Sequence, residues 1–278
     1  MARPVTFTLD FEDPRTSPDQ PERVDVVTFR LLDWLAERSI TGSIFCVASV
    51  AQRYPKLLER MTADGHEVGV HGWDHTPIDK MDAATFTAQI TKAKECLEQL
   101  SNSSITMYRA PIFSLVPETY WATDCLVEMG FTVSSSVLSA ANPQYGWPGA
   151  PTTPFLWPNG LIEIPSPLHR FGPLTVPYLG GAYLRLIPAF LRKRAVQKAN
   201  PDDVLWTYCH PYEFDPDEPF YSFADGGWIA ARVSHFRRKA MLKLMEGVVA
   251  EPGPKLSAVA AELRDLQVFS PPLIVSES

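Results

Sequence analysis

The chain has 278 residues, of which 45% are hydrophobic and 21% charged, so it can bury a substantial core as one large domain or two small ones. Its net charge of -7 argues against nucleic acid as the main partner, because phosphate binding needs a basic surface. Four widely spaced cysteines predict free thiols instead of a disulfide framework. The N-terminus lacks the pattern of a signal peptide and no stretch reaches 18 apolar residues, so we expect a cytoplasmic protein without stable membrane insertion.

Strands and helices alternate through the first half of the chain. Short β-branched and aromatic runs predict strands at 5–10, 43–47, 67–71, 106–110 and 131–136. Apolar residues at helical spacing predict helices between them, at 24–38, 48–65, 82–100 and 117–130. This alternation requires a parallel sheet with helical crossovers.

The pattern changes between Ala140 and Pro188, where proline is dense and helical periodicity is absent. We expect long loops with short strands there, and loops of that length often carry function. A helix at 189–200, a buried strand at 204–210 and helices at 228–249 and 255–266 then restore the alternation. For the basic stretch at 235–245 we expect a solvated helix face, with a membrane or partner contact as the alternative.

Taken as a single domain, these elements predict an α/β fold, either a (β/α) barrel or an open doubly wound sheet. Both folds place their functional site at the carboxyl ends of the strands. Polar groups follow four of the predicted strands and should therefore point to the same rim. They are Asp10, Glu12 and Asp13 after the first strand, His71 and His75 after the third, Arg109 after the fourth, and His210 after the strand at 204–210.

The histidines of HGWDH predict a metal site. His71 and His75 are four residues apart, so one helical turn from Gly72 to His75 would direct both imidazoles the same way. Two imidazoles and a carboxylate are the usual three protein ligands of a catalytic zinc. His66 precedes the strand and is expected to be a packing or capping residue instead.

The remaining polar groups suggest a division of roles. Asp10, nearest the strand end, is our candidate for the base that takes a proton from water, while Glu12 or Asp13 would be the carboxylate ligand; spacing alone does not choose between them. Arg109 is well placed to pair with Asp10. His210 ends an apolar strand and would protonate a leaving amine.

Four motifs, LDFED, HGWDH, RAPIFS and YCHPYEFD, occur in an order that resembles the polysaccharide deacetylases, the NodB-homology or family-four carbohydrate esterases. The HPYEFDP ending and the segment GGAYLRLIP are similar to the branch found with exopolysaccharide gene clusters. The likeness covers roughly residues 5–220, within one catalytic domain that has a C-terminal helical extension at 228–278. It implies a distorted (β/α) barrel, a divalent metal (zinc first, cobalt or nickel as alternatives) and removal of an N-acetyl or O-acetyl group from a sugar.

Carried over by position, the resemblance makes Asp10 the base, His71 and His75 metal ligands, Arg109 the residue that orients the base and His210 the acid. Ile112 would lend its backbone N–H to the oxyanion. Two positions depart from the family pattern. The first motif normally has adjacent aspartates, which leaves Glu12 and Asp13 open, and the fourth normally supplies an aspartate for the acid histidine, where this chain has Ser134, Ser135 and Ser136. Glu213 or Asp215 would then support His210.

The substrate is expected to be a carbohydrate or another small amide, and oligomerisation stays open. Trp73, Trp147 and Trp157 are candidates for stacking on sugar rings, with ordinary packing as the alternative, and Pro111 is placed with them in the substrate-binding set. Two other functions are compatible with these motifs. One is an amidase that opens a small cyclic amide or ureide on the same barrel, and the other is a non-catalytic carbohydrate-binding protein.

Overall fold

The computed structural model describes residues 3–15, 20–220 and 227–271. Its main sheet has seven strands in the order β1-β2-β3-β4-β5-β7-β6. Every neighbouring pair is parallel except β6 and β7, which are antiparallel. The strands are β1 (Phe7–Phe11), β2 (Gly42–Cys46), β3 (Glu67–Val70), β4 (Met107–Tyr108), β5 (Val133–Ser134), β6 (Phe155–Leu156) and β7 (Ile162–Glu163), with a separate hairpin of β8 (His169–Phe171) and β9 (Leu174–Val176). The predicted parallel sheet with crossovers is confirmed.

Residues 205–209 run beside β1 and curl the sheet toward a barrel. The backbone N–H of Thr6 donates to the carbonyl of Leu205 (2.8 Å), and that of Asp10 donates to the carbonyl of Cys209 (2.8 Å). The predicted strand at 204–210 forms only an isolated bridge, at Trp206. On its other side, the Tyr208 carbonyl accepts from the N–H of Gly181, the first residue of helix α6 (Gly181–Leu186), at 2.7 Å. The architecture is therefore a distorted (β/α) barrel with a short ladder at this position.

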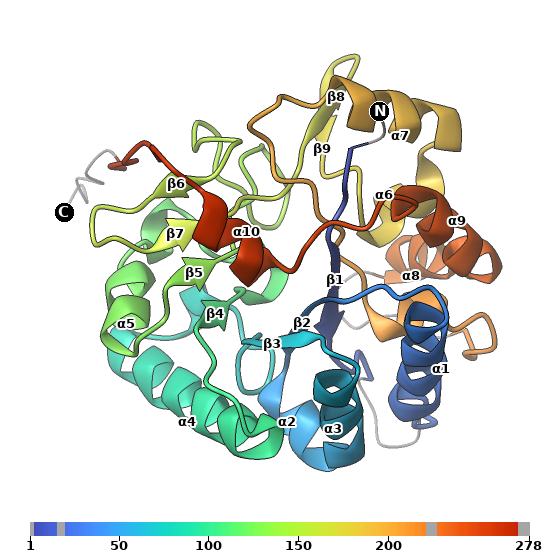
Figure 1. Cartoon of the computed structure of the whole chain (residues 1–278), viewed down its shortest axis with the longest axis horizontal. Helices are drawn as coiled ribbons and strands as arrows, with labels where there is room; N and C mark the ends of the chain where they lie inside the picture. The colour runs from blue at the N-terminus through green and yellow to red at the C-terminus, as the bar shows by residue number, and fades with distance from the viewer. Residues whose placement is uncertain (1–2, 16–19, 221–226, 272–278) are drawn as a thin grey trace.

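The helices cover the outside of this sheet (Figure 1). In the first half they are α1 (Val24–Ala36), α2 (Ala48–Arg53), α3 (Pro55–Ala63), α4 (Ala83–Ser101) and α5 (Ala122–Glu128). In the second half they are α6 (Gly181–Leu186), α7 (Ala189–Lys198), α8 (Gly227–His235), α9 (Met241–Val248) and α10 (Leu256–Glu262). Short 3₁₀ turns lie at Ile78–Lys80, Pro111–Phe113, Pro117–Thr119, Pro211–Phe214 and Arg238–Ala240.

Several predicted helices are shorter than expected. The helix predicted at 48–65 is two helices, because Pro55 disfavours helical geometry at Tyr54 (φ -126°, ψ 58°). The helix predicted at 228–249 is interrupted at Arg237, which has left-handed backbone angles (φ 55°). The helix predicted from Pro117 begins as a 3₁₀ turn, and its α-helical part begins only at Ala122.

The core fills the space between the sheet and these helices. Leu9, Phe11, Leu31, Ile44 and Val70 are all buried in one large cluster. All four cysteines are free, and Cys46 and Cys209 are buried as their apolar surroundings predict. Within the described ranges no helix has the length and apolar character needed to cross a membrane.

Candidate active site

The four polar segments converge on one cleft of about 520 Å³ at the carboxyl ends of the strands. Asp10 is the residue before Phe11, the last residue of strand β1, and Glu12 follows that strand directly. His71 follows β3 and Arg109 follows β4. His210 follows the segment that runs beside β1. Parallel strands end at a common rim, so residues distant along the chain meet there.

Arg109 is completely buried and pairs with Asp10. Its Nη1 lies 2.6 Å from Asp10 Oδ1 and also donates to the hydroxyl of Thr8 (2.9 Å). Its guanidinium is sandwiched between the rings of Phe45 and Trp206, with Cζ at 3.9 and 4.2 Å from the ring centroids. Hydrogen bonds and stacking thus fix the cation in one plane, which fixes the orientation of the Asp10 carboxylate.

The serines of the fourth motif hold this arginine and its neighbour instead of His210. The Arg109 Nη2 donates to the Ser135 hydroxyl (3.1 Å), and the N–H of Ala110 donates to the Ser136 hydroxyl (2.9 Å). Buried Glu163 accepts from the N–H of Ser136 (2.6 Å) and so anchors the serine segment from behind. Burial raises the pKa of Glu163.

Glu12, His71 and His75 form the one group of three potential ligands found among the described residues, with ligand atoms all within 4.8 Å of one another. The two imidazole rings meet edge to face, with centroids 5.1 Å apart. No helical turn brings them together: the segment after β3 is a loop, in which Gly72 (φ 85°) and His75 (φ 67°) both have left-handed backbone angles. The prediction of a helical turn from Gly72 to His75 is therefore wrong, although the two imidazole rings do come together.

These three residues fit a divalent cation. The Oε2 atom of Glu12 is buried and receives no hydrogen bond within the described part of the chain. It lies 2.6 Å from the Nε2 atom of His75, with which it forms an ion pair when that imidazole is protonated. His71 Nδ1 lies 2.9 Å from the carbonyl of Arg109, which leaves Nε2 for a ligand. Burial lowers the pKa of His71 to about 4, so its imidazole is neutral at pH 7, as ligation requires. Burial opposes ionisation of Glu12, but the charges of His75 and His210 hold its pKa below the usual value.

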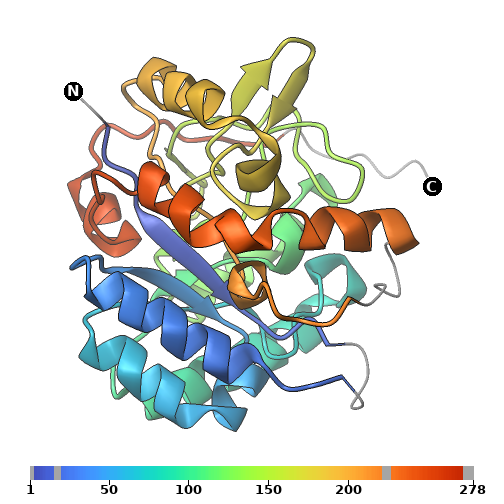
Figure 2. The same ribbon diagram turned by 90° about the vertical axis from the view of Figure 1, so that its right-hand side faces the viewer.

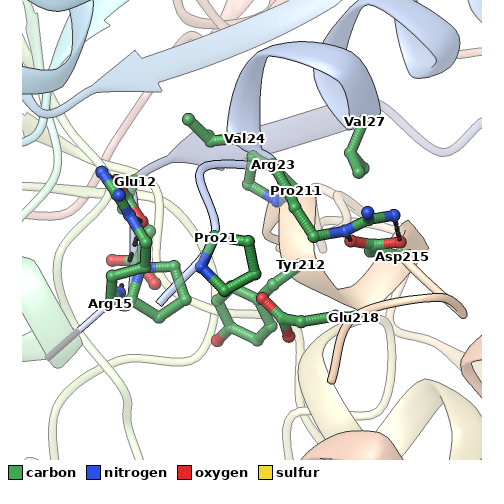
Figure 3. Close-up of a pocket in the computed structure, with 12 residues that line it drawn as sticks. Glu12, Arg15, Pro21, Arg23, Val24, Val27, Pro211, Tyr212, Asp215 and Glu218 are labelled. Carbon is green, nitrogen blue, oxygen red and sulfur yellow. Dashed lines mark hydrogen bonds and ion pairs between the residues drawn. The ribbon is translucent and has the colours of Figure 1, made fainter. Parts of the chain in front are cut away.

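Asp13 points away from the two histidines. Its carboxylate lies 2.8 Å from Arg15 and 2.8 Å from Arg53, and these charges lower its pKa although burial opposes them. Figure 3 shows Arg15 beside Glu12 and Pro21, around a small cavity of about 10 Å³, which is near the lower limit for one water. Of the two acids left open by the sequence, Glu12 is therefore the one that faces the histidines.

Glu213 supports His210 from the side opposite the cleft. Its Oε2 lies 3.1 Å from His210 Nδ1, and its Oε1 accepts from the buried Arg185 (2.8 Å). Burial disfavours the charged imidazole, but Glu12 and Glu213 together raise the pKa of His210 to about 9. Asp215, the other candidate, is paired with Arg23 of the segment before α1 (Figure 3).

The backbone at Ile112 adopts an unusual conformation. Ile112 (φ 56°) and Phe113 (φ 57°) are successive left-handed residues, which is rare for a β-branched side chain. Both line the cleft. In the described part of the chain, no atom accepts a hydrogen bond from the Ile112 N–H. A backbone donor held in this way is available to a bound oxyanion.

The predicted tryptophans do not line the cleft. Trp147 and Trp157 are only 3% and 1% exposed, and their ring centroids lie 5.4 Å apart. The prediction that they stack on sugar rings is therefore wrong for both. Trp73 lies under the Nζ of Lys92, and buried Pro111 packs beside Gly72. The cleft is lined instead by side chains that the sequence analysis missed, namely Tyr145, Tyr183, Tyr208, Tyr212, Phe113, Leu138, Asn142 and Gln144. Four of these residues, Phe113, Tyr183, Tyr208 and Tyr212, lie within the motifs RAPIFS, GGAYLRLIP and YCHPYEFD, which were the sequence signal for them.

The cleft combines a candidate cation site, a carboxylate oriented by Arg109, a histidine held by Glu213 and a backbone N–H that has no acceptor among the described residues. This combination is typical of hydrolases that act on an acyl group. Comparison with known proteins agrees with that class. Residues 5–132 match the polysaccharide deacetylase family, and residues 135–249 match a domain of unknown function, DUF3473. Residues 5–132 therefore form a polysaccharide deacetylase domain of the NodB-homology type, and the second match is consistent with the exopolysaccharide-cluster branch.

Individual relatives are similar over part of the chain or in fold. A chitin deacetylase from Pestalotiopsis is 30% identical over 114 residues, 40% of this chain and 35% of that protein. A candidate polysaccharide deacetylase from Mycobacterium smegmatis has the same fold, with a TM-score of 0.60 and 19% identity over 98% of this chain and 100% of the other. A family 4 acetyl xylan esterase from Clostridium thermocellum, solved with a cobalt ion, also has a similar fold. Its TM-score is 0.51 and its sequence identity is 15%, over 93% of this chain and 91% of the other. The chain spans about a third of the length of the curated relatives it matches first.

Proposed function

We propose that this protein is a metal-dependent hydrolase that removes an acetyl group from an amino sugar within an oligo- or polysaccharide. One observation carries the proposal. The Glu12, His71 and His75 group lies directly beside Asp10, whose Oδ2 is 4.0 Å from the Nε2 atoms of both His71 and His210. A cation site, a base and an acid thus share one cleft.

A divalent cation held by Glu12, His71 and His75 would polarise the acyl carbonyl and make a water molecule more acidic. Asp10, oriented by Arg109, accepts the proton of the attacking water. The Ile112 N–H donates to the oxyanion of the tetrahedral intermediate, a contribution of ~3 kcal/mol for one such donor. His210, supported by Glu213, gives its proton to the departing sugar nitrogen.

The substrate class rests on the polysaccharide deacetylase match and on the similarity to a chitin deacetylase. The cleft is open and lined by four tyrosines, which suits a chain of sugar rings because aromatic faces can stack on them. His210 as a proton donor favours an N-acetyl group, since an amine leaves poorly without protonation. Zinc, cobalt and nickel all suit the donor set of two imidazoles and one carboxylate.

The test is acetate release from N-acetylated chitooligosaccharides by the purified chain with added zinc. Acetylated xylan and small cyclic amides serve as the other substrates. Asp10→Asn should abolish turnover while zinc still binds, because the base is not a ligand. Acetate release from xylan alone, or ring opening alone, would contradict the proposal, and so would a chain that binds sugars without turnover.

The two neighbouring acids provide a matched pair for the metal site. Glu12→Gln should weaken zinc binding at least tenfold in calorimetry, because it replaces the carboxylate that faces the histidines. Asp13→Asn removes the same charge one residue later and should leave zinc affinity within about twofold. Equal losses in the two variants would contradict the assignment of Glu12.

A further inference from the structure

A second concave site lies between α7 and α9 and shares no lining residue with the catalytic cleft. It is a groove of about 630 Å³ that also reaches Arg3 and Glu251. Figure 2 shows α7 above the α8–α9 pair on one side of the molecule. The groove's floor is aliphatic, with Ala189, Val196, Leu244 and Val248 among its lining residues.

The charge around this groove is opposite to that of the whole chain. Residues 186–200 and 227–245 together contain nine of the 25 lysines and arginines and none of the 32 acidic residues. Arg192, Lys193, Arg237 and Lys243 line the groove, and Glu251 is the one acid among its lining residues. In a protein of net charge -7, such segregation makes a local positive surface.

Arg192 has no acidic partner among the described residues, whereas Arg238 of the same segments is paired with Glu218. The Arg192 side chain is 4% exposed, and its Nη1 donates to the carbonyls of Leu184 and Ile187. Its Nε is buried without a hydrogen-bond partner among the described residues. Burial and the neighbouring charge of Arg237 lower the pKa of Arg192. A buried guanidinium surrounded by carbonyls and another cation lacks an anion.

Two exposed apolar side chains lie close in sequence to the groove-lining residue Ala189. Phe190 is 71% exposed at the start of α7, and Leu186 is 47% exposed at the end of α6. Phe190, Lys193 and Gln197 are spaced at i, i+3 and i+7, so they share one stripe of α7. An apolar ring thus stands next to a cation that lines the groove. Cations with adjacent exposed apolar groups match a phosphate joined to a hydrocarbon chain.

We propose that the groove between α7 and α9 binds anionic phospholipid at a membrane surface, with the phosphate at Arg192 and Arg237 and the hydrocarbon along Phe190 and the aliphatic floor. The protein would associate with the surface reversibly, through charge and a few apolar contacts. This inference is independent of the hydrolase activity proposed above, because the groove contains none of the catalytic residues.

The experiment is sedimentation of the full chain with vesicles of phosphatidylglycerol mixed with phosphatidylcholine, compared with phosphatidylcholine alone. We expect binding to the anionic vesicles only. Lys193→Glu with Lys243→Glu should lower the partition constant by about 30-fold or more, since each basic residue near such a surface contributes about one factor of five. Phe190→Ser should lower it by about tenfold. Both lysines and Phe190 are exposed, so folding should be unaffected.

The matched control is Lys56→Glu with Arg264→Glu, which makes the same change in net charge at exposed positions away from the groove. It should retain nearly the whole affinity for anionic vesicles. The proposal is overturned if the unmodified chain does not sediment with them, or if the control loses as much binding as the groove variant. Binding of inorganic phosphate in calorimetry without vesicle binding would also overturn it, because the site would then serve a soluble anion.

Discussion

Breaking the buried pair of Arg109 and Asp10 from the arginine side should destabilise the protein strongly. In Arg109→Met the methionine can still fill the space between Phe45 and Trp206, but Asp10 keeps a buried charge without its partner. Leaving one buried charge unpaired costs about 3–5 kcal/mol. A domain of this size has roughly 5–15 kcal/mol in total, so the variant should be only marginally folded.

The magnitude can be assigned to the charge by a double-mutant cycle in urea at pH 7. Asp10→Asn with Arg109→Met removes both charges, so it should recover about 2–3 kcal/mol relative to the sum of the single changes. Arg53→Met is the control, because Arg53 is 44% exposed in its ion pair with Asp13 and should cost about 1 kcal/mol or less. Strictly additive effects of the two site variants would refute the reasoning.

Three further predictions concern titrating groups. Glu213→Gln should lower kcat by about 10- to 100-fold with little change in KM, because Glu213 touches His210 and not the cleft; a change confined to KM would contradict this. In the metal-free protein the pKa of His210 is raised to about 9, above the ordinary 6.5, so the imidazole should stay protonated until the pH rises through about 9. NMR titration should find this value, and Glu213→Gln should lower it. Burial lowers the pKa of His66, whose Nδ1 accepts a hydrogen bond from the N–H of Gly42 (3.0 Å). The neutral imidazole therefore contributes to stability above pH 6.5, and this contribution is lost as the pH falls below that value. His66→Asn should flatten the pH dependence of the free energy of unfolding below about pH 6.5, and an unchanged slope would contradict the assignment.

Local patterns predicted the elements and the rim of the cleft well. The spacing of Leu31, Ile90 and Leu97 marks helices α1 and α4, and all three side chains are buried. The placement of Asp10, His71 and Arg109 at strand ends was sufficient to bring them together, because parallel strands leave their sheet on one edge. These inferences need only the period of the sequence and the direction of the strands.

Choices that depend on distant partners could not be made from the sequence. Glu12 and Asp13 are neighbours, and Arg53, 40 residues from Asp13, is part of what turns that acid away. Trp147 and Trp157 lie in a proline-rich segment that suggested exposure. They are covered because Phe269, near the other end of the chain, packs against both. The local spacing of apolar residues in the sequence carries no information about contacts of this kind.

The paired left-handed residues at Ile112 and Phe113 separate two properties of a single position. The N–H that would face the oxyanion belongs to the main chain, whose angles are set by the turn, while the Ile112 side chain is 38% exposed on the cleft. Evolution can therefore change the shape of the binding surface here without losing the donor. Glycine at position 112 would adopt these angles with less strain but would remove the side chain that lines the cleft. Other bulky residues at this position should therefore be tolerated.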